Sequence, residues 1–147
     1  MKKILLPLLS VFSLSVFADF TSLNTEQTQQ AIKNGVAIID IRRPDEFQRY
    51  GTIPSAHKLT FFDERGQYNT TEWLKKFRKI VKDKDQPFIL VCAHANRTKT
   101  VGRFLSNKLG YTNSQELSGG IINGWIDKGL ATTKIAAGEG KPWYKLW

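Results

Sequence analysis

Runs of apolar residues, many of them β-branched, occur twice in the middle of the chain, and a single Asp is the one charged residue within them. Residues 36–41 read Val-Ala-Ile-Ile-Asp-Ile, and residues 87–91 read Pro-Phe-Ile-Leu-Val. A strand buried on both faces of a parallel sheet has this continuous pattern, because neither of its sides faces water. Shorter runs at 57–61 and 113–117 indicate two further strands. The sequence therefore predicts a parallel sheet.

Apolar residues at helical spacing separate these strand segments, and such a face packs on a sheet while the opposite face stays polar. Brief helices are predicted to begin near residues 24, 44 and 121. Two longer helical patterns are marked by Trp73, Phe77, Ile80 and Val81, and by Val101, Phe104, Leu105 and Leu109. Strands that alternate with helices indicate an α/β fold, with a parallel sheet flanked by helices on both faces.

The first 18 residues have the pattern of a secretory signal peptide. Lys2 and Lys3 precede an apolar stretch, and Val16-Phe17-Ala18 is a small-x-Ala cleavage sequence. The stretch is shorter than the roughly 20 apolar residues of a membrane-spanning helix. We expect export, most simply to the periplasm, and no stable membrane insertion after cleavage. An uncleaved N-terminal anchor is the alternative.

We expect residues 19–134 to form one domain and residues 135–147 to form an aromatic tail. The tail contains Trp143, Tyr144 and Trp147 without a clear period. Packing of these rings on the domain surface is the simpler interpretation, and contact with a membrane interface or a partner is the alternative.

The composition gives the chain a basic surface. Lys and Arg number 22 against 13 Asp and Glu, for a net charge of +9. Removal of the first 18 residues takes away two lysines and lowers this charge to +7. The basic residues are scattered, as on a solvated helix face, so no nucleic acid partner is expected. A positive surface does attract small anions.

Cys92 is the only cysteine of the chain and ends the second apolar run. It has no partner for an internal disulfide, so in an oxidising compartment it is either a buried bystander or a functional thiol. A short loop follows it and leads into a predicted helix. The amides and dipole of a helix N-terminus favour an anion, and the thiolate is the nucleophilic form of cysteine. Cys92 is therefore the candidate nucleophile.

The loop after Cys92 is the candidate substrate-binding segment. Arg97 is expected to shape an anion site, and His94 to add positive charge when protonated. The segment consists of Ala93, His94, Ala95, Asn96, Arg97 and Thr98.

Asp40 and Arg42 are the candidate supports of this loop. Asp40 is interpreted as a buried carboxylate that fixes backbone or Arg97. Arg42 lies either at the pocket rim or in a salt bridge with Asp45 or Glu46. One cysteine and two histidines are not spaced as a ligand set, so neither a metal nor another cofactor is expected.

Four segments together resemble the rhodanese superfamily, in particular its small, exported, single-domain members. The second half of the first apolar run continues into a segment similar to the family's Asp-Val-Arg…Glu-Tyr motif, and three later segments match its Gly-His-Ile-Pro-Gly-Ala turn, its active-site loop and its Gly-Gly…Trp signature. These segments are 39–47, 51–56, 91–98 and 117–125.

The resemblance implies a five-stranded, mainly parallel sheet and transfer of sulfane sulfur. Cys92 would take sulfur from a small anionic donor such as thiosulfate, hold it as a persulfide, and pass it to a thiol acceptor or an acceptor protein. Covalent catalysis of this kind gives ping-pong kinetics. A non-enzymatic persulfide carrier or sulfur-sensing domain is the alternative, because it shares every one of these sequence features.

The loop length bears on a third alternative, a relative of the phosphatases and arsenate reductases of the same superfamily. Residues 92–97 form a loop of six, one residue shorter than the loop of those enzymes, which favours sulfur over phosphate. Ala93 and Ala95 stand where many thiosulfate-using members have a basic residue and a glycine. Weak use of thiosulfate, or preference for another donor, is therefore expected.

Overall fold

The computed structural model describes residues 19–135. The predicted signal segment, 1–18, and residues 136–147 of the predicted aromatic tail lie outside this part of the chain. Within residues 19–135, no helix has the length and apolar character needed to cross a membrane.

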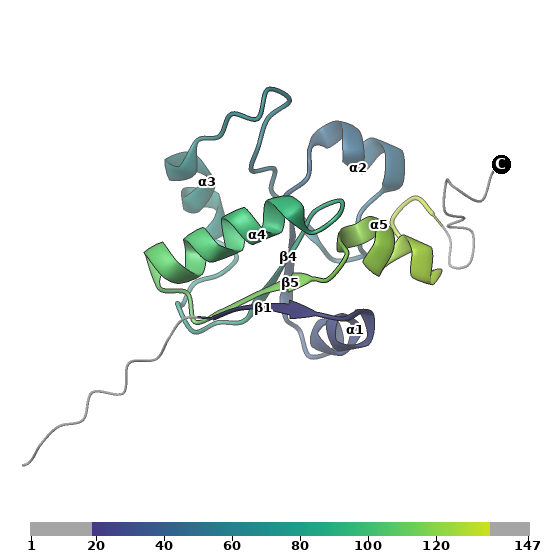
Figure 1. Ribbon diagram of the computed structural model, residues 1–147, viewed down its shortest axis with the longest axis horizontal. Helices are drawn as coiled ribbons and strands as arrows, with labels where there is room; N and C mark the ends of the chain where they lie inside the picture. Colours follow the sequence, from purple (N-terminus) through teal and green to yellow (C-terminus); the bar gives the residue numbers. More distant parts are fainter. Residues whose placement is uncertain (1–18, 136–147) are drawn as a thin grey trace, which may run out of the picture.

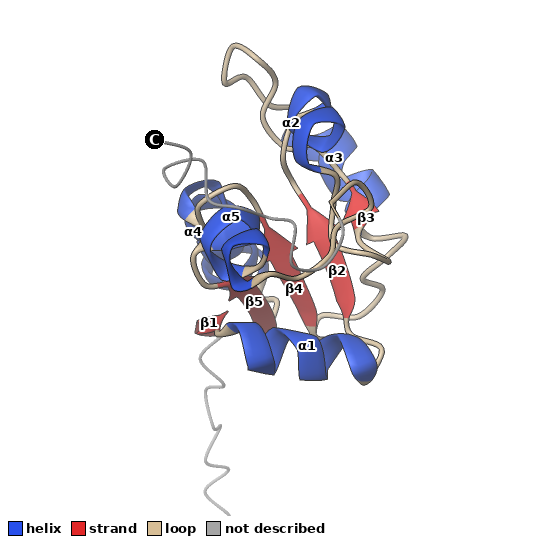
Figure 2. Ribbon diagram, turned by 90° about the vertical axis from the view of Figure 1, so that its right-hand side faces the viewer, coloured by secondary structure: helices blue, strands red, loops and turns tan. Residues whose placement is uncertain are grey.

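The centre of the fold is a five-stranded sheet in the order β1-β5-β4-β2-β3 (Figure 2). All neighbouring strands are parallel. The strands are β1 (Asp19–Leu23), β2 (Ala37–Asp40), β3 (His57–Lys58), β4 (Phe88–Val91) and β5 (Asn113–Leu117). The predicted α/β fold with a five-stranded parallel sheet is confirmed.

Helices cover both faces of the sheet, with α4 on one side and α1 on the other (Figure 1). A five-residue π-helical stretch extends α4, and a short 3₁₀ turn follows α5. The helices are α1 (Thr25–Lys33), α2 (Pro44–Tyr50), α3 (Thr70–Phe77), α4 (Asn96–Arg103) and α5 (Gly120–Gly124).

The hydrophobic core is divided by the sheet into two clusters. The cluster under α3 and α4 includes Leu90, Phe77 and Leu105, and the cluster under α1 and α5 includes Ile89 and Ile121. Leu90 and Ile89 are neighbours on β4 and face opposite sides, as alternate residues of a strand must. All four residues of β4 are fully buried, which explains why its sequence is continuously apolar.

Helix α3 is shorter than the sequence pattern predicts. The side chain of Asn69 caps it by accepting from the backbone N–H of Glu72 at 3.1 Å, and the helix ends at Phe77. Turns follow, and the Val81 N–H still donates to the Phe77 carbonyl at 2.9 Å. The turns keep Val81 in the core, so its apolar spacing is real although the residue lies beyond the helix.

The edge strand β1 has no counterpart among the four strand segments that the sequence pattern indicates. It pairs along its whole length with β5. Phe20 of β1 packs against α4 at Gly102, where an added Cβ would come within 2.1 Å of the Phe20 ring. The strand therefore depends on a helix some 80 positions later, a relation that no local pattern contains.

The carboxyl ends of β2 and β4 lie next to each other and bring two loops together. Asp40 is the register partner of Val91, and the Ile41 N–H donates to the Val91 carbonyl at 2.9 Å. In open parallel sheets, ligands bind at this edge. Cys92 comes directly after Val91 and thus lies at the edge where a site is expected.

Candidate active site

Cys92 lies where β4 turns toward α4, and its side chain is buried at 1% exposure. It belongs to the core cluster under α3 and α4. Its Sγ lies 3.7 Å from the Oγ1 of Thr98, in the first turn of α4. The loop thus returns the chain so that the helix N-terminus faces the sulfur, an arrangement that favours an anion on sulfur.

The turn between strand and helix is formed by Ala95, whose φ of +59° places it in the left-handed region. Ala95 is buried, while His94 and Asn96 on either side of it are exposed. The His94 Nδ1 lies 3.2 Å from Oδ1 of Asn123. A residue other than glycine therefore takes the left-handed conformation in this loop.

The turn before α5 supports the loop from behind. The N–H of Ile121 donates to the Cys92 carbonyl at 2.8 Å, and the N–H of Ile122 donates to the Ala93 carbonyl at 3.1 Å. A Cβ added at Gly120 would lie 2.4 Å from the Ala93 carbonyl oxygen and 2.5 Å from that of Cys92. Only glycine permits this approach, so Gly120 allows the backbone of the loop to pack directly against the start of α5.

Arg97 is held in place by Glu46 of α2. Its Nη1 and Nη2 donate to the two carboxylate oxygens at 2.7 and 2.6 Å. The pKa of Arg97 is raised by this hydrogen bonding against the lowering effect of burial, and the charges of Glu46 and Cys92 raise it further. Glu46 uses two of the five N–H groups of the guanidinium. A fixed positive charge thus stands beside the cysteine.

Glu46 is the acidic member of the ion pair with Arg97. Burial alone raises the pKa of Glu46. Hydrogen bonds from Arg97 and from the Arg43 backbone N–H, with the charges of both arginines, outweigh burial, so the pKa of Glu46 lies below its ordinary value. The Arg43 N–H donates to Oε2 at 3.0 Å. Sequence reasoning had placed Glu46 only as a possible partner of Arg42, although it lies within the family-like segment 39–47.

Asp40 and Arg42 form a buried pair behind the loops. Both side chains are fully buried, and Arg42 Nη2 lies 2.6 Å from Asp40 Oδ2. Asp40 also accepts from Thr52 Oγ1 at 2.7 Å and from the Arg42 backbone N–H at 3.2 Å, and Arg42 donates to the Gly51 carbonyl at 2.6 Å.

This pairing differs from two of the alternatives that the sequence left open. Asp40 fixes backbone, as expected, but its arginine is Arg42 and not Arg97. Arg42 lies in the interior and not at a pocket rim, and its ion pair is with Asp40 and not with Asp45 or Glu46. The reason is geometric: a charged side chain at the end of a buried strand points inward and must find its partner there.

A network missed by the sequence analysis lies on the other side of the sulfur. Thr98 donates its hydroxyl proton to Oε2 of Glu116 on β5, and Ser22 of β1 donates to Oε1 at 2.6 Å. Glu116 and Thr98 are both buried. One signal was present in the sequence, since Glu116 is a carboxylate inside a predicted strand.

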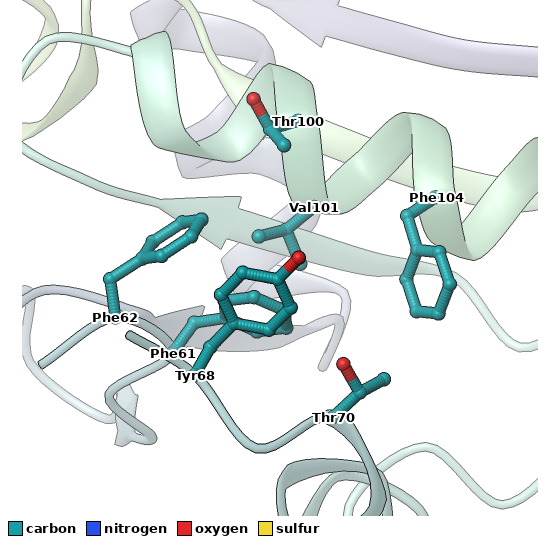
Figure 3. A pocket seen from close by; sticks show the side chains of 7 residues that line it. All are labelled: Phe61, Phe62, Tyr68, Thr70, Thr100, Val101 and Phe104. Carbon is teal, nitrogen blue, oxygen red and sulfur yellow. The ribbon is translucent and has the colours of Figure 1, made fainter. Parts of the chain in front are cut away.

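Two hollows share Phe62, and the larger of them borders the loop at Arg97. One of about 220 Å³ is lined mainly by aromatic rings, with Tyr68 in front of Phe61 in the view of Figure 3. The other, of about 450 Å³, is lined by Arg43 and Arg97 among others. Phe61 and Phe62 thus both line the smaller hollow.

Comparisons with known proteins agree with this geometry. The profile of the Rhodanese-like domain family matches residues 24–128. A rhodanese-related protein from Thermoplasma volcanium is 26% identical, with a TM-score of 0.57 over 76% of this chain and 95% of that one. No curated protein sequence matches significantly.

Two further solved structures share the fold. The thiosulfate sulfurtransferase from Pseudomonas aeruginosa is 24% identical, with a TM-score of 0.56 over 76% of this chain and 20% of that chain. The polysulfide-sulfur transferase homodimer from Wolinella succinogenes is 20% identical, with a TM-score of 0.56 over 79% and 80% of the two chains. The chain belongs to the rhodanese-like domain family.

Proposed function

We propose that the protein is a sulfurtransferase that carries sulfane sulfur as a persulfide on Cys92. The observation that carries the proposal is the position of this single cysteine, at the N-terminus of α4 and near the fixed cation of Arg97, which belongs to the first turn of that helix. Two structural neighbours whose names describe sulfur transfer support the choice of reaction.

The first half-reaction forms the persulfide. The Cys92 thiolate attacks the outer sulfur of a donor such as thiosulfate, a new S–S bond forms, and the donor's S–S bond breaks with its electron pair leaving on sulfite. The N–H groups of the loop, the α4 dipole and Arg97 stabilise the negative charge that moves through the site.

The second half-reaction regenerates the cysteine. A thiophilic acceptor, such as a small thiol or the cysteine of an acceptor protein, attacks the terminal sulfur of the persulfide, and Cys92 leaves as a thiolate. The two steps balance without an oxidant, reductant or cofactor. Their separation is the basis of the expected ping-pong kinetics.

The loop is proposed to be poorly suited to thiosulfate as a donor. Ala93 adds no charge to the loop, and Ala95 holds a conformation suited to glycine. A dianionic donor therefore meets one fixed arginine rather than two basic groups. We expect Ala93→Arg to increase the rate of thiosulfate turnover, and an unchanged rate would contradict the charge argument.

Mass spectrometry of the protein after incubation with thiosulfate or another sulfane donor tests the central proposal. We expect a mass gain of one sulfur that is absent from Cys92→Ser. Catalytic thiocyanate formation from cyanide would then distinguish an enzyme from a persulfide carrier, the alternative that shares this site. Absence of a sulfur adduct with every sulfane donor would overturn both.

Export to the periplasm belongs to the proposal and is supported by the composition of residues 1–18. Cleavage after Ala18 would leave Asp19, the first residue of β1, as the new N-terminus. The intact mass of the protein recovered from a periplasmic fraction tests this, and a mass that includes residues 1–18 would favour a retained anchor.

A further inference from the structure

Glu116 is a buried carboxyl group to which the proposed reaction assigns no role. It is 1% exposed and lies on β5, between β1 and β4, as the register partner of Ser22 on β1 and of Leu90 on β4. Two hydroxyl groups, of Ser22 and Thr98, donate to it. Among the described residues, no lysine or arginine forms an ion pair with it. Its hydrogen bonds to these two hydroxyl groups are therefore what compensates for its burial.

The hydroxyl of Thr98 has a single proton to give. In the structure that proton goes to Oε2 of Glu116, while Oγ1 also lies 3.7 Å from the Sγ of Cys92. While Glu116 takes the proton, Thr98 offers only lone pairs to the sulfur, which suits a thiol S–H donor. A thiolate needs the reverse, a hydroxyl that donates to sulfur.

We propose that Glu116 is a positioning residue that sets the direction of the Thr98 hydroxyl and thereby couples its own protonation to that of Cys92. The inference rests on the proposed function in one respect, that Cys92 reacts as a thiolate.

The coupling is a transfer of one proton along three groups. The S–H proton of Cys92 passes to Thr98 Oγ1, and the hydroxyl proton of Thr98 passes to Glu116 Oε2. The products are a thiolate, a hydroxyl that now donates to it, and a neutral carboxylic acid. The total charge of the buried site does not change, so no charge has to enter or leave it.

Other charged groups near the cysteine act in a defined direction. Arg97, fixed by Glu46, favours the thiolate and so draws the proton toward Glu116. Lys99, the next residue on α4, is exposed. Within the described part of the chain, His94 belongs to the loop itself, Arg43 lines a hollow together with Arg97, and the mutually paired Asp40 and Arg42 lie at the end of β2.

The rate of Cys92 alkylation by iodoacetamide as a function of pH tests the coupling. Because the chain has one cysteine, the measured alkylation rate belongs to Cys92 alone. In Glu116→Gln the side chain can no longer accept a proton, and its amide N–H₂ donates to Thr98, which leaves the hydroxyl to donate to sulfur. We expect the midpoint of the profile to fall by about one pH unit, or about tenfold faster alkylation below the midpoint.

Repeating the Glu116→Gln substitution in a protein that lacks the Thr98 hydroxyl distinguishes an effect through this hydroxyl from the simple loss of a nearby negative charge. Thr98→Val keeps the shape of the side chain and removes the hydroxyl. We expect Glu116→Gln to shift the midpoint far less when combined with Thr98→Val. An equal shift in both backgrounds, or no shift in either, would overturn the proposal.

Ser22→Ala gives an independent reading if Glu116→Gln does not fold. It removes one donor to the carboxylate, favours the neutral acid, and is expected to shift the midpoint in the same direction by a smaller amount. An unchanged midpoint in that folded variant would count against the coupling. Glu26→Gln, at an exposed position on α1, is the matched control and should leave the profile unchanged. Alkylation needs no sulfur donor, so its outcome is separate from that of the persulfide experiment.

Discussion

At the scale of single residues, the active-site loop is shaped by backbone conformation as much as by its side chains. Ala95 has a φ of +59° and is 4% exposed. A non-glycine residue in the left-handed region is strained by about 1–2 kcal/mol. The strain persists because α4 begins immediately afterwards and because the α5 turn holds the loop from behind.

Ala95→Gly is expected to change the free energy of unfolding by less than about 0.5 kcal/mol, since relief of strain offsets the lost methyl burial and the greater freedom of the unfolded chain. Ala31→Gly, in the helical part of α1, is the matched control and should cost about 1 kcal/mol. Urea denaturation measures both. Equal losses in the two variants would mean that Ala95 carries no strain.

At the scale of secondary-structure elements, one ion pair joins two helices across the active site. Glu46 lies on α2 and Arg97 on α4, and the chain between them contains two strands and a third helix. The pair is partly buried and bidentate, the geometry that contributes most among ion pairs near a surface. It therefore links the position of Arg97, the candidate anion-binding cation, to the position of α2.

The lowered pKa of Glu46 predicts how this link depends on pH. A carboxyl group whose pKa is lower in the folded than in the unfolded state adds stability above the ordinary pKa of Glu, about 4.3, and loses it as the pH falls through the lowered value. Glu46→Gln should therefore be less stable than the parent at pH 7, and the difference should disappear in stronger acid. Urea unfolding from pH 7 into acid measures it, and a difference that does not shrink as the pH falls below the ordinary pKa of Glu would contradict the assignment.

The contact between the α5 turn and the loop gives a second prediction at this scale. Gly120→Ala should disturb the loop, because its Cβ would meet the carbonyl groups of Ala93 and Cys92, which are backbone and cannot turn aside. Gly110 has a similar positive φ but nothing within 4 Å of an added Cβ. Gly110→Ala is thus the control for the cost of the backbone conformation alone.

We expect Gly120→Ala to lower the thermal unfolding midpoint well beyond Gly110→Ala and to alter the rate of Cys92 alkylation. Similar losses in the two variants would show that the close approach is not required.

At the scale of the whole molecule, β4 is a strand whose side chains enter both halves of the core, as those of its neighbour β2 also do. Its four residues are fully buried, with alternate side chains in the two clusters, and Cys92 follows directly. The candidate nucleophile is thus attached to a fully buried central strand, whereas β1 and β3 are edge strands. Rigid support of this kind limits the motion of the loop to the few residues after Cys92.

Amide hydrogen exchange followed by NMR should reflect this arrangement. The amides of β4 are expected to exchange most slowly, through global unfolding, and those of β1 and β3 to exchange through smaller local openings. Exchange of β1 as slow as that of β4 would indicate that the edge strand unfolds only with the whole domain.

The sequence by itself determined the α/β class, the central strands and the candidate nucleophile. Each of these depends on a local property. The properties are a continuous apolar run in β2 and in β4, helical spacing of apolar residues in the helices that flank the sheet, and one cysteine at the end of a strand. Such properties repeat over a few residues, so they can be recognised without knowledge of the fold.

The tertiary structure decided which side chains meet around Cys92. Arg97 and Glu46 are 51 positions apart, and Ser22 and Glu116 are 94 apart. These contacts arise because parallel strands place distant loops at one sheet edge and because buried polar groups must find partners there. The same reason explains why Arg42 pairs with Asp40 and why β1 joins the sheet. It also explains why the buried carboxyl group of Glu116 is connected to the Cys92 sulfur through the single hydroxyl of Thr98.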